Sequence, residues 1–335
     1  MNTGVDRVER PDDLPAQWDE LATRYYQKRE FLRHCHACNP CRQRYFMLSQ
    51  NGNLLAGAVM YTLKLDLFTY LGIKSPTTMH IIGIPASVSS GGLLGDPAHY
   101  GTLLKGVLPG ESGLIVCLNL DNVPAGSPMF VGRTWPNIVL ANRFASWEHY
   151  LAALRSHYRR RLHQVLEDAA GFETRRMPCN LYTDKMHALY LEVHRRSKGR
   201  LERLISTFFR NLPESFCLTT YTAGGKLRGW TITLRDGDRF CFFLGGQDYS
   251  YSPRRLYLVK LLDVVKSGVE SGASTIDLGQ SAEVPKMRLG GRAHEKIMLA
   301  YHRSLIPRVM LRAGMGVLSY RKHFPDTNVF KGGVL

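Results

Sequence analysis

The sequence predicts an α+β protein made of two similar halves, each a mixed, mostly antiparallel sheet flanked by helices. Residues 51–72 and 223–245 share one pattern: a turn pair of the Asn-Gly or Gly-Gly type, then two β-rich runs, the second of which ends at a glycine. A further strand is expected in both halves, over residues 114–120 and 274–280. Because the order of elements repeats, we interpret the chain as an internal duplication.

A helical segment, residues 146–171, separates the two halves. Its apolar residues recur at spacings of three and four, which places them on one face of a helix. These residues are Leu151, Leu154, Tyr158, Leu162 and Val165. Ser146 is suited to cap the start of this helix and Gly171 to end it. Two more helical segments are predicted, around residues 183–199 and 201–211.

The size of the chain fits one large domain or two of ordinary size, since its 335 residues are 44% hydrophobic and 10% aromatic. The first 13 residues lack the apolar core of a signal peptide, and Lys64 and Asp66 interrupt the longest apolar stretch. Seven cysteines, an odd number, fit reduced thiols better than a disulfide framework. We therefore expect a cytoplasmic monomer without integral membrane contact.

The formal net charge of +16 suggests a polyanionic partner, such as nucleic acid, an anionic membrane surface or a phosphorylated cofactor. Basic residues cluster on the outer face of the linking helix and again near residue 198. The residues expected to contact nucleic acid are Arg155, Arg159, Arg160, Arg161, Arg195, Arg196, Lys198 and Arg200. The alternative is a solvated basic surface. Residues 307–324 are also basic and partly amphipathic, and they fit either RNA or an anionic membrane.

The stretch HCHACNPC, residues 34–41, places three cysteines at intervals of three, with two histidines between them. A structural zinc site usually needs four ligands, often as two pairs, and no Cys-x-x-Cys occurs elsewhere in the sequence. We therefore expect no metal, and predict a helix end followed by a turn, with reduced cysteines packed inside. Nothing nearby repeats the Cys–His–acid arrangement of a nucleophilic cysteine.

A candidate site lies in IDLGQSAEVPKMRLGG, residues 276–291. A buried strand is expected to end at residues 277–279, and polar side chains then crowd a short loop, where rigid sheets commonly position functional groups. These side chains are Gln280, Ser281, Glu283, Lys286 and Arg288. The alternative is an ordinary surface loop in which Glu283 pairs with Arg288.

This region resembles the GNAT acyltransferase superfamily, and within it the Fem-like branch with two GNAT domains and the related BioF2-like acetyltransferase domains. The resemblance rests on residues 158–161, 216–246, 253–272 and 277–283, and on Lys286 followed four residues later by Gly290. It spans residues 20–305. It implies a GNAT-like domain at residues 1–145, a second at 146–312, and a basic tail at 313–335.

The resemblance implies that an amine attacks the carbonyl of an activated acyl donor and forms an amide. Glu283 is then the candidate base or amine-orienting carboxylate. Lys286 and Arg288 are candidates for holding a donor phosphate or the oxyanion. Further candidate substrate contacts are Gln280, Gln247, Tyr249, His80 and Ser87.

The donor is the open question in this resemblance. GNAT proteins that use acyl-CoA carry a Gln/Arg-x-x-Gly-x-Gly/Ala loop, whose backbone N–H groups cradle the pyrophosphate at a helix N-terminus. The matching position here, GGQDYSYSPRRLYL, lacks the motif. This fits the Fem-like branch, whose donor is an aminoacyl-tRNA, acting on an amine-bearing peptide or small molecule without any other cofactor. An acyl-CoA-dependent N-acetyltransferase is the alternative, and a non-catalytic RNA-binding protein is the third hypothesis.

Overall fold

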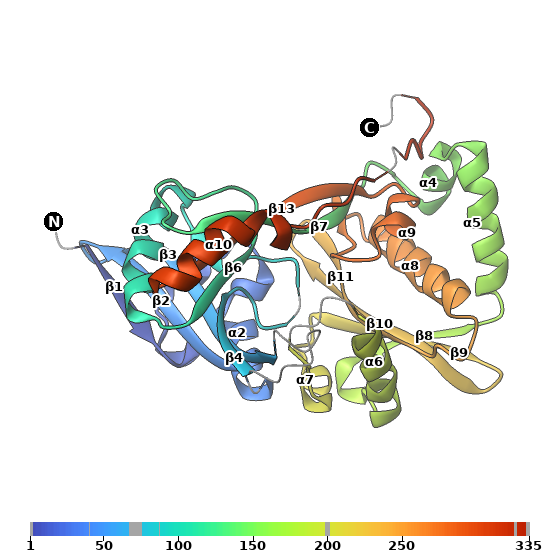
Figure 1. Cartoon of the computed structure of the whole chain (residues 1–335). Helices are drawn as coiled ribbons and strands as arrows, with labels where there is room; N and C mark the ends of the chain where they lie inside the picture. Colours follow the sequence, from blue (N-terminus) through green and yellow to red (C-terminus); the bar gives the residue numbers. More distant parts are fainter. Residues whose placement is uncertain are drawn as a thin grey trace. The chain divides into compact units, whose positions relative to one another are not determined.

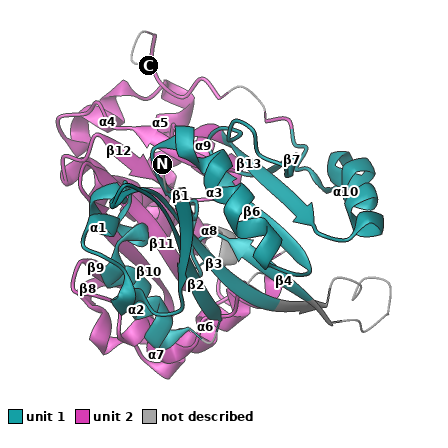
Figure 2. Cartoon of the chain, turned by 90° about the vertical axis from the view of Figure 1, so that its left-hand side faces the viewer, with its two compact units in different colours: residues 1–135, 295–322 teal, residues 136–294, 323–335 magenta. Residues whose placement is uncertain are grey.

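The computed structural model describes residues 3–39, 41–66, 76–86, 88–197, 202–324 and 327–332. The chain divides into two units (Figure 2). Unit 1 consists of residues 1–135 and 295–322, and unit 2 of residues 136–294 and 323–335. Each unit therefore combines a long segment with a short one from further along the chain.

The strands of unit 1 form a sheet in the order β1-β2-β3-β4-β6-β13, and β5 pairs with β3. The bounds are β1 Thr3–Val8, β2 Arg42–Gln50, β3 Asn53–Asp66, β4 Pro76–Ile82, β5 Leu93–Gly95, β6 Leu114–Leu120 and β13 Arg292–His302. Only β4 and β6 pair in parallel among the described pairs of this unit. The hairpin between β2 and β3 turns at Asn51 and Gly52, both with positive φ, as the turn pair predicts.

The sheet of unit 1 is covered on both faces. Its helices are α1 Gln17–Leu21, α2 Arg29–Cys38, α3 Tyr100–Val107 and α10 Leu305–Leu318, with short 3₁₀ turns at Pro11–Asp13, Tyr25–Gln27, Pro97–His99 and Leu108–Gly110. Tyr45 of β2 packs against Trp18 of α1, with ring centroids 6.2 Å apart, whereas the next residue, Phe46, belongs to the core under α3. Gly57 of β3 is required here, since a Cβ would lie 2.6 Å from the Trp18 ring.

The strands of unit 2 form a sheet in the order β7-β12-β11-β10-β9-β8. The bounds are β7 Phe130–Ala141, β8 Glu173–Pro178, β9 Phe216–Ala223, β10 Lys226–Asp236, β11 Arg239–Gln247 and β12 Thr275–Asp277. Only β11 and β12 pair in parallel among the described pairs. Both units thus repeat an antiparallel meander followed by one parallel pair, which confirms the α+β class and the two similar sheets.

The helices of unit 2 lie on both faces of its sheet. They are α4 Trp147–Ala153, α5 Ser156–Ala169, α6 Asp184–Arg196, α7 Ser206–Arg210, α8 Pro253–Glu270 and α9 Glu283–Met287, with a 3₁₀ turn at Cys179–Leu181. Figure 1 shows α4, α5, α8 and α9 on one face, and α6 and α7 on the other. Tyr221 of β9 packs with Leu256 of α8, while the indole of Trp230 in β10 donates to the Met186 carbonyl of α6.

Two strands, β7 and β13, run from one unit into the other. β7 begins in unit 1 and pairs with β12 in unit 2, whereas β13 begins in unit 2 and pairs with β6 in unit 1. The linear division predicted from the sequence, 1–145, 146–312 and 313–335, differs from these units. Its last boundary also falls inside α10, because the amphipathic pattern that begins before residue 312 continues to Leu318.

The prediction of one continuous helix over residues 146–171 was wrong. The segment forms two helices, α4 and α5, separated at Leu154 and Arg155. Leu154 is extended and bridges Phe330, and the Arg155 amide donates to the Val329 carbonyl at 3.0 Å. Contacts with residues 329 and 330 therefore replace helical hydrogen bonding at this break. The N-cap prediction was correct, since the Ser146 side chain accepts from the His149 amide.

Candidate active site

The loop that follows β12 has a strained backbone. Asp277 accepts a hydrogen bond from the Gly279 amide at 2.8 Å and another from the Asn137 side chain at 3.0 Å. Ser281 and Ala282 then have φ values of 61° and 47°, in the left-handed region that non-glycine residues seldom adopt. Two such residues in succession, directly before α9, indicate a loop whose shape is imposed by its surroundings.

Lys286 is buried inside this loop. Its Nζ donates to the Gln280 carbonyl at 2.7 Å and to the Gly279 carbonyl at 3.1 Å. Burial lowers the pKa of Lys286 to about 7, although the charges of Asp277 and Glu283 raise it. The ammonium group therefore joins α9 to the loop. Its predicted role toward a donor phosphate or an oxyanion remains a prediction.

Glu283 opens α9 and is buried. The charges of Glu283 and Tyr249 both raise the pKa of Tyr257 in α8, which burial already raises more strongly. Glu283 and Tyr249, both predicted from the sequence, are therefore electrostatic neighbours of one phenol. Because Tyr257 stays protonated at neutral pH, it can donate a hydrogen bond but cannot act as a base.

A cavity of about 690 Å³ lies beside this cluster, between α5, α8 and the segment that begins with α9. Its lining is Tyr158, Arg161, Leu162, Gln164, Val165, Asp168, Ser252, Arg255, Tyr257, Leu258, Leu262, Pro285, Arg288 and Leu289. Most of the lining side chains are leucine, valine, proline and tyrosine. A cavity of this volume suits a small organic group, and its apolar lining suits an acyl chain.

Three arginines surround the apolar lining, one from each of three helical segments. Arg255 of α8 pairs with Asp168 of α5, with 3.0 Å between Nε and Oδ2. Arg161 of α5 and Arg288, which caps the end of α9, are exposed, and neither forms an ion pair with another described residue. The cavity therefore carries two uncompensated cations, a combination suited to an acyl group attached to a phosphate-bearing carrier.

The residues around this cavity match a known family. Residues 151–287 fit the family model described as acetyltransferase (GNAT) domain. The resemblance to the GNAT superfamily found in the sequence is thereby confirmed over these residues, and the cavity lies within the matched segment except for Arg288 and Leu289, which directly follow it.

Solved structures show the same fold over most of the chain. The C-terminal domain of a protein from Agrobacterium fabrum, described as a lysylphosphatidylglycerol synthetase, has a TM-score of 0.52 at 11% identity and covers 84% of this chain and 89% of that one. L-PGS from Bacillus licheniformis has a TM-score of 0.52 at 10% identity, covering 83% and 90%. A tandem GNAT protein from the clavulanic acid biosynthesis pathway has a TM-score of 0.51 at 10% identity, covering 91% and 99%.

These likenesses show the fold of the chain over both units. No curated protein sequence matches the chain. Within the described residues, no helix has the length and apolar character needed to cross a membrane.

The remaining predicted residues of the matched segment differ in burial, and none of them is among the described residues that line the cavity. Gln247 is buried at the end of β11, and Gln280 is half-buried in the loop after β12. The guanidinium of Arg196 lies over the Tyr249 ring, 4.4 Å from its centroid. The Nε of Arg155 donates to the Phe330 carbonyl at 3.0 Å, so this arginine is partly occupied in fixing the chain end.

The other residues predicted to contact nucleic acid fall on two helices. Arg159 is half-buried and Arg160 is exposed on α5, while Arg195 and Arg196 are exposed at the end of α6. Lys198 and Arg200 lie outside the described residues, as does Ser87. The structure thus brings Arg161 and Arg288 together at the cavity, and it leaves the α6 arginines to a separate surface of the domain.

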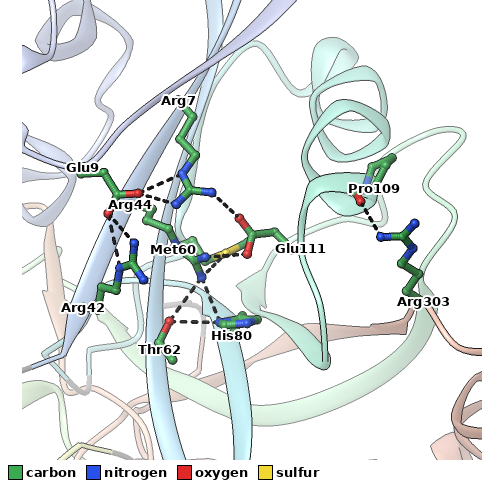
Figure 3. A network of polar contacts seen from close by, with 10 residues as sticks. All are labelled: Arg7, Glu9, Arg42, Arg44, Met60, Thr62, His80, Pro109, Glu111 and Arg303. Carbon is green, nitrogen blue, oxygen red and sulfur yellow. Dashed lines mark hydrogen bonds and ion pairs between the residues drawn. The ribbon is translucent and has the colours of Figure 1, made fainter.

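His80, predicted as a substrate contact, lies instead in a buried ionic network of unit 1 (Figure 3). Its Nδ1 is 2.9 Å from Arg44 and 3.0 Å from the Thr62 hydroxyl. Arg44 also pairs with the buried Glu111 at 2.5 Å. Burial lowers the pKa of His80, and the charge of Arg44 lowers it further. This network links β2, β3 and β4 to Glu111, which lies shortly before β6, and a substrate role for His80 remains a prediction.

The cysteines of HCHACNPC form no disulfide. Cys35 and Cys38 are buried on α2, which ends at Cys38 as the sequence predicts, and Cys41 is half-buried beyond it. Among the described residues, no group of three or more histidine, cysteine or acidic side chains is placed to hold a metal ion.

Sequence reasoning did not identify several of the cavity residues. Tyr158 was placed on an apolar helix face and within a segment that carries the resemblance, but not at a site. Arg255, Tyr257 and Leu258 entered only as part of the helical segment 253–272. A signal was present in Arg254-Arg255, two arginines in the first turn of a helix that follows a β-meander. These arginines indicate a basic helix start. Because the glycine-rich donor motif is absent at this position, the sequence did not link them to a donor site.

Proposed function

We propose that this protein is an N-acyltransferase that forms an amide bond on an amine acceptor and takes its acyl group from an aminoacyl-tRNA. The observation that carries the proposal is the apolar cavity in the GNAT domain with the uncompensated Arg161 and Arg288 at its edge. The apolar lining accommodates an aminoacyl group and excludes water. The two cations suit the phosphates to which such a group is linked.

Each residue of the site has a role that follows from its chemistry. The acceptor amine attacks the acyl carbonyl, a C–N bond forms, and the bond between the acyl carbon and the carrier oxygen breaks. Glu283 accepts the proton of the amine, directly or through water, and passes it to the leaving carrier oxygen, which departs as a hydroxyl group. The protonated Tyr257 donates a hydrogen bond to the carbonyl oxygen and keeps its own proton. Lys286 holds the loop, so that Glu283 keeps its place beside Tyr257.

Two further features support tRNA as the donor. Residues 155–161 contain four arginines and no carboxylate, directly beside the cavity. The proteins described as lysylphosphatidylglycerol synthetase and L-PGS share the fold, and the first is named for a product that contains a lysyl group. We infer from these features that the transferred group is an amino acid.

Acyl-CoA is the alternative donor, and one observation favours it. Ser252 and Arg255, at the start of the 18-residue helix α8, line the same cavity. The amide groups at a helix N-terminus attract phosphate, and Arg255 would add a cation there. The tandem GNAT protein with the same fold is described in relation to AcCoA.

Fluorescence anisotropy of labelled tRNA, titrated at two salt concentrations with excess coenzyme A as competitor, separates the two donors. We expect binding that weakens steeply with salt and that coenzyme A does not reverse. The Glu283→Gln variant should bind tRNA as the wild type does while losing aminoacyl transfer to an added amine. Absence of tRNA binding at low salt, or displacement of tRNA by coenzyme A, would overturn the tRNA proposal.

A further inference from the structure

The last helix of unit 1, α10, exposes its apolar side. Ten large apolar side chains are exposed in the described part of the chain, and six of them belong to α10: Leu305, Ile306, Val309, Met310, Val317 and Leu318. Val317 is 88% exposed and Ile306 74%. A surface helix normally turns its apolar side toward the core, so this helix has the reverse orientation.

The exposed side chains form one continuous face. With about 100° between successive residues, five of the six fall within an arc of about 140°, and Leu318 lies outside it. Met315 lies on the opposite side and is buried over Gly132, where a Cβ would come within 2.6 Å of its methyl group. The end of the helix is tied to Arg133, whose amide donates to the Ser319 hydroxyl and whose carbonyl accepts from the Tyr320 amide. The helix is therefore docked with its apolar face outward.

The segment that contains α10 carries charges of one sign. Residues 296–325 contain six lysines and arginines and no carboxylate. Arg303 lies before the helix, Arg312 within it, and Arg321 and Lys322 after it, and all four are exposed. An apolar helix face bordered by cations on several sides is the pattern of a helix that lies in the interface of an anionic membrane.

We propose that α10 is a membrane-surface helix that docks unit 1 on an anionic lipid bilayer, with its apolar face among the acyl chains and its arginines at the phosphates. With 14 residues, it is shorter than the roughly 20 that a spanning helix requires. RNA fits this face poorly, because apolar side chains offer nothing to a phosphate backbone. A second copy of the chain also fits poorly, because a symmetric contact would oppose the same cations on both partners. This inference concerns unit 1 and does not depend on the proposed acyl transfer.

Vesicle flotation with the full chain tests the inference. The protein is mixed with vesicles of phosphatidylcholine alone, or of phosphatidylcholine with phosphatidylglycerol, at low and at high salt. We expect binding to the anionic vesicles at least roughly tenfold stronger than to the neutral ones, and weaker at high salt. The Ile306→Ser/Met310→Ser variant should lose roughly tenfold or more of that binding. Circular dichroism should show its fold unchanged, since both side chains are exposed.

Val123→Ser supplies the matched control, because Val123 is an exposed apolar residue of unit 1 outside α10. Its vesicle binding should equal that of the wild type. The Arg312→Ala/Arg321→Ala variant should reduce the preference for anionic vesicles. Equal binding to both vesicle types, no binding at low salt, or equal loss in Val123→Ser would overturn the proposal. It would also fail if light scattering showed a dimer that the Ile306→Ser/Met310→Ser variant converts to a monomer, because a second copy would then cover the face.

Discussion

The two uncompensated arginines at the cavity edge allow a direct test of how the donor is held. Arg161 comes from α5 and Arg288 from the end of α9, so only the folded GNAT domain places them at one opening. Replacing both with alanine removes two positive charges and leaves the apolar lining in place. We expect the Arg161→Ala/Arg288→Ala variant to fold normally and to bind tRNA more weakly.

The size of the effect follows from exposure. Solvent screens both guanidinium groups, so each contact with a phosphate is expected to contribute about 1 kcal/mol. Loss of both then corresponds to about 2 kcal/mol, or about 30-fold in Kd. The slope of log K against log salt should become shallower by about 1.4 to 1.8, as expected for two lost phosphate contacts. The unfolding free energy should change by less than about 0.5 kcal/mol, since neither arginine pairs with a described residue.

Arg235→Ala is the matched control for this measurement. Arg235 is an exposed arginine of the same unit, at the turn between β10 and β11, and it does not line the cavity. Anisotropy titrations of labelled tRNA, run in parallel at several salt concentrations, compare the variants. If the double variant bound tRNA as tightly as Arg235→Ala, the cavity edge would not be where the donor phosphates lie.

Two further predictions concern the buried charges. Glu111→Ala should lower the unfolding free energy measured in urea by about 3–5 kcal/mol, because it leaves Arg44 buried without its partner. Glu9→Ala, in the exposed part of the same network, should lower it by about 1 kcal/mol or less. Equal losses of unfolding free energy in the two variants would show that the network is not buried. Lys260, whose Nζ donates to the Gly246 carbonyl, has its pKa lowered by burial from 10.5 to about 7. Between these two pH values the unfolded chain binds a proton that the folded chain has lost. The unfolding free energy should therefore rise as the pH increases from about 7 to 9. Urea titrations of Lys260→Met should show a shallower rise, by up to about 1.4 kcal/mol per pH unit, and an unchanged slope would contradict the assignment.

The local elements of the fold could be predicted because their signals are local. The turn pairs at Asn51-Gly52 and Gly224-Gly225, the strand over residues 114–120 and the N-cap at Ser146 all depend on a few adjacent residues. The break between α4 and α5 depends instead on Val329 and Phe330, about 175 residues further along the chain. The courses of β7 and β13, which run from one unit into the other, could not be predicted for a similar reason. A β-rich pattern does not specify which sheet a strand will join.

The site shows the same limit. The loop at residues 276–291 could be identified because polar side chains follow a buried strand and glycines. Its partners, α5 and α8, lie on either side of a whole β-meander, and the sequence does not indicate that their apolar faces leave a cavity between them. Arg161 was therefore assigned to a basic helix face and Arg288 to a loop, although both face one opening. Both arginines could be identified from the sequence as anion-binding candidates. That they lie close together could be seen only in the folded structure.

The position of Lys286 connects the strain of the loop to the chemistry proposed for it. Ser281 and Ala282 hold left-handed conformations that cost about 1–2 kcal/mol each, and a loop with this backbone would relax unless something opposed it. The hydrogen bonds from Lys286 to the carbonyls of Gly279 and Gln280 oppose that relaxation from inside the loop. Relaxation would carry Glu283, which directly follows Ala282, away from Tyr257. In the proposed mechanism, Lys286 therefore keeps the candidate base, Glu283, near Tyr257, so the backbone of this loop contributes to the site together with its polar side chains.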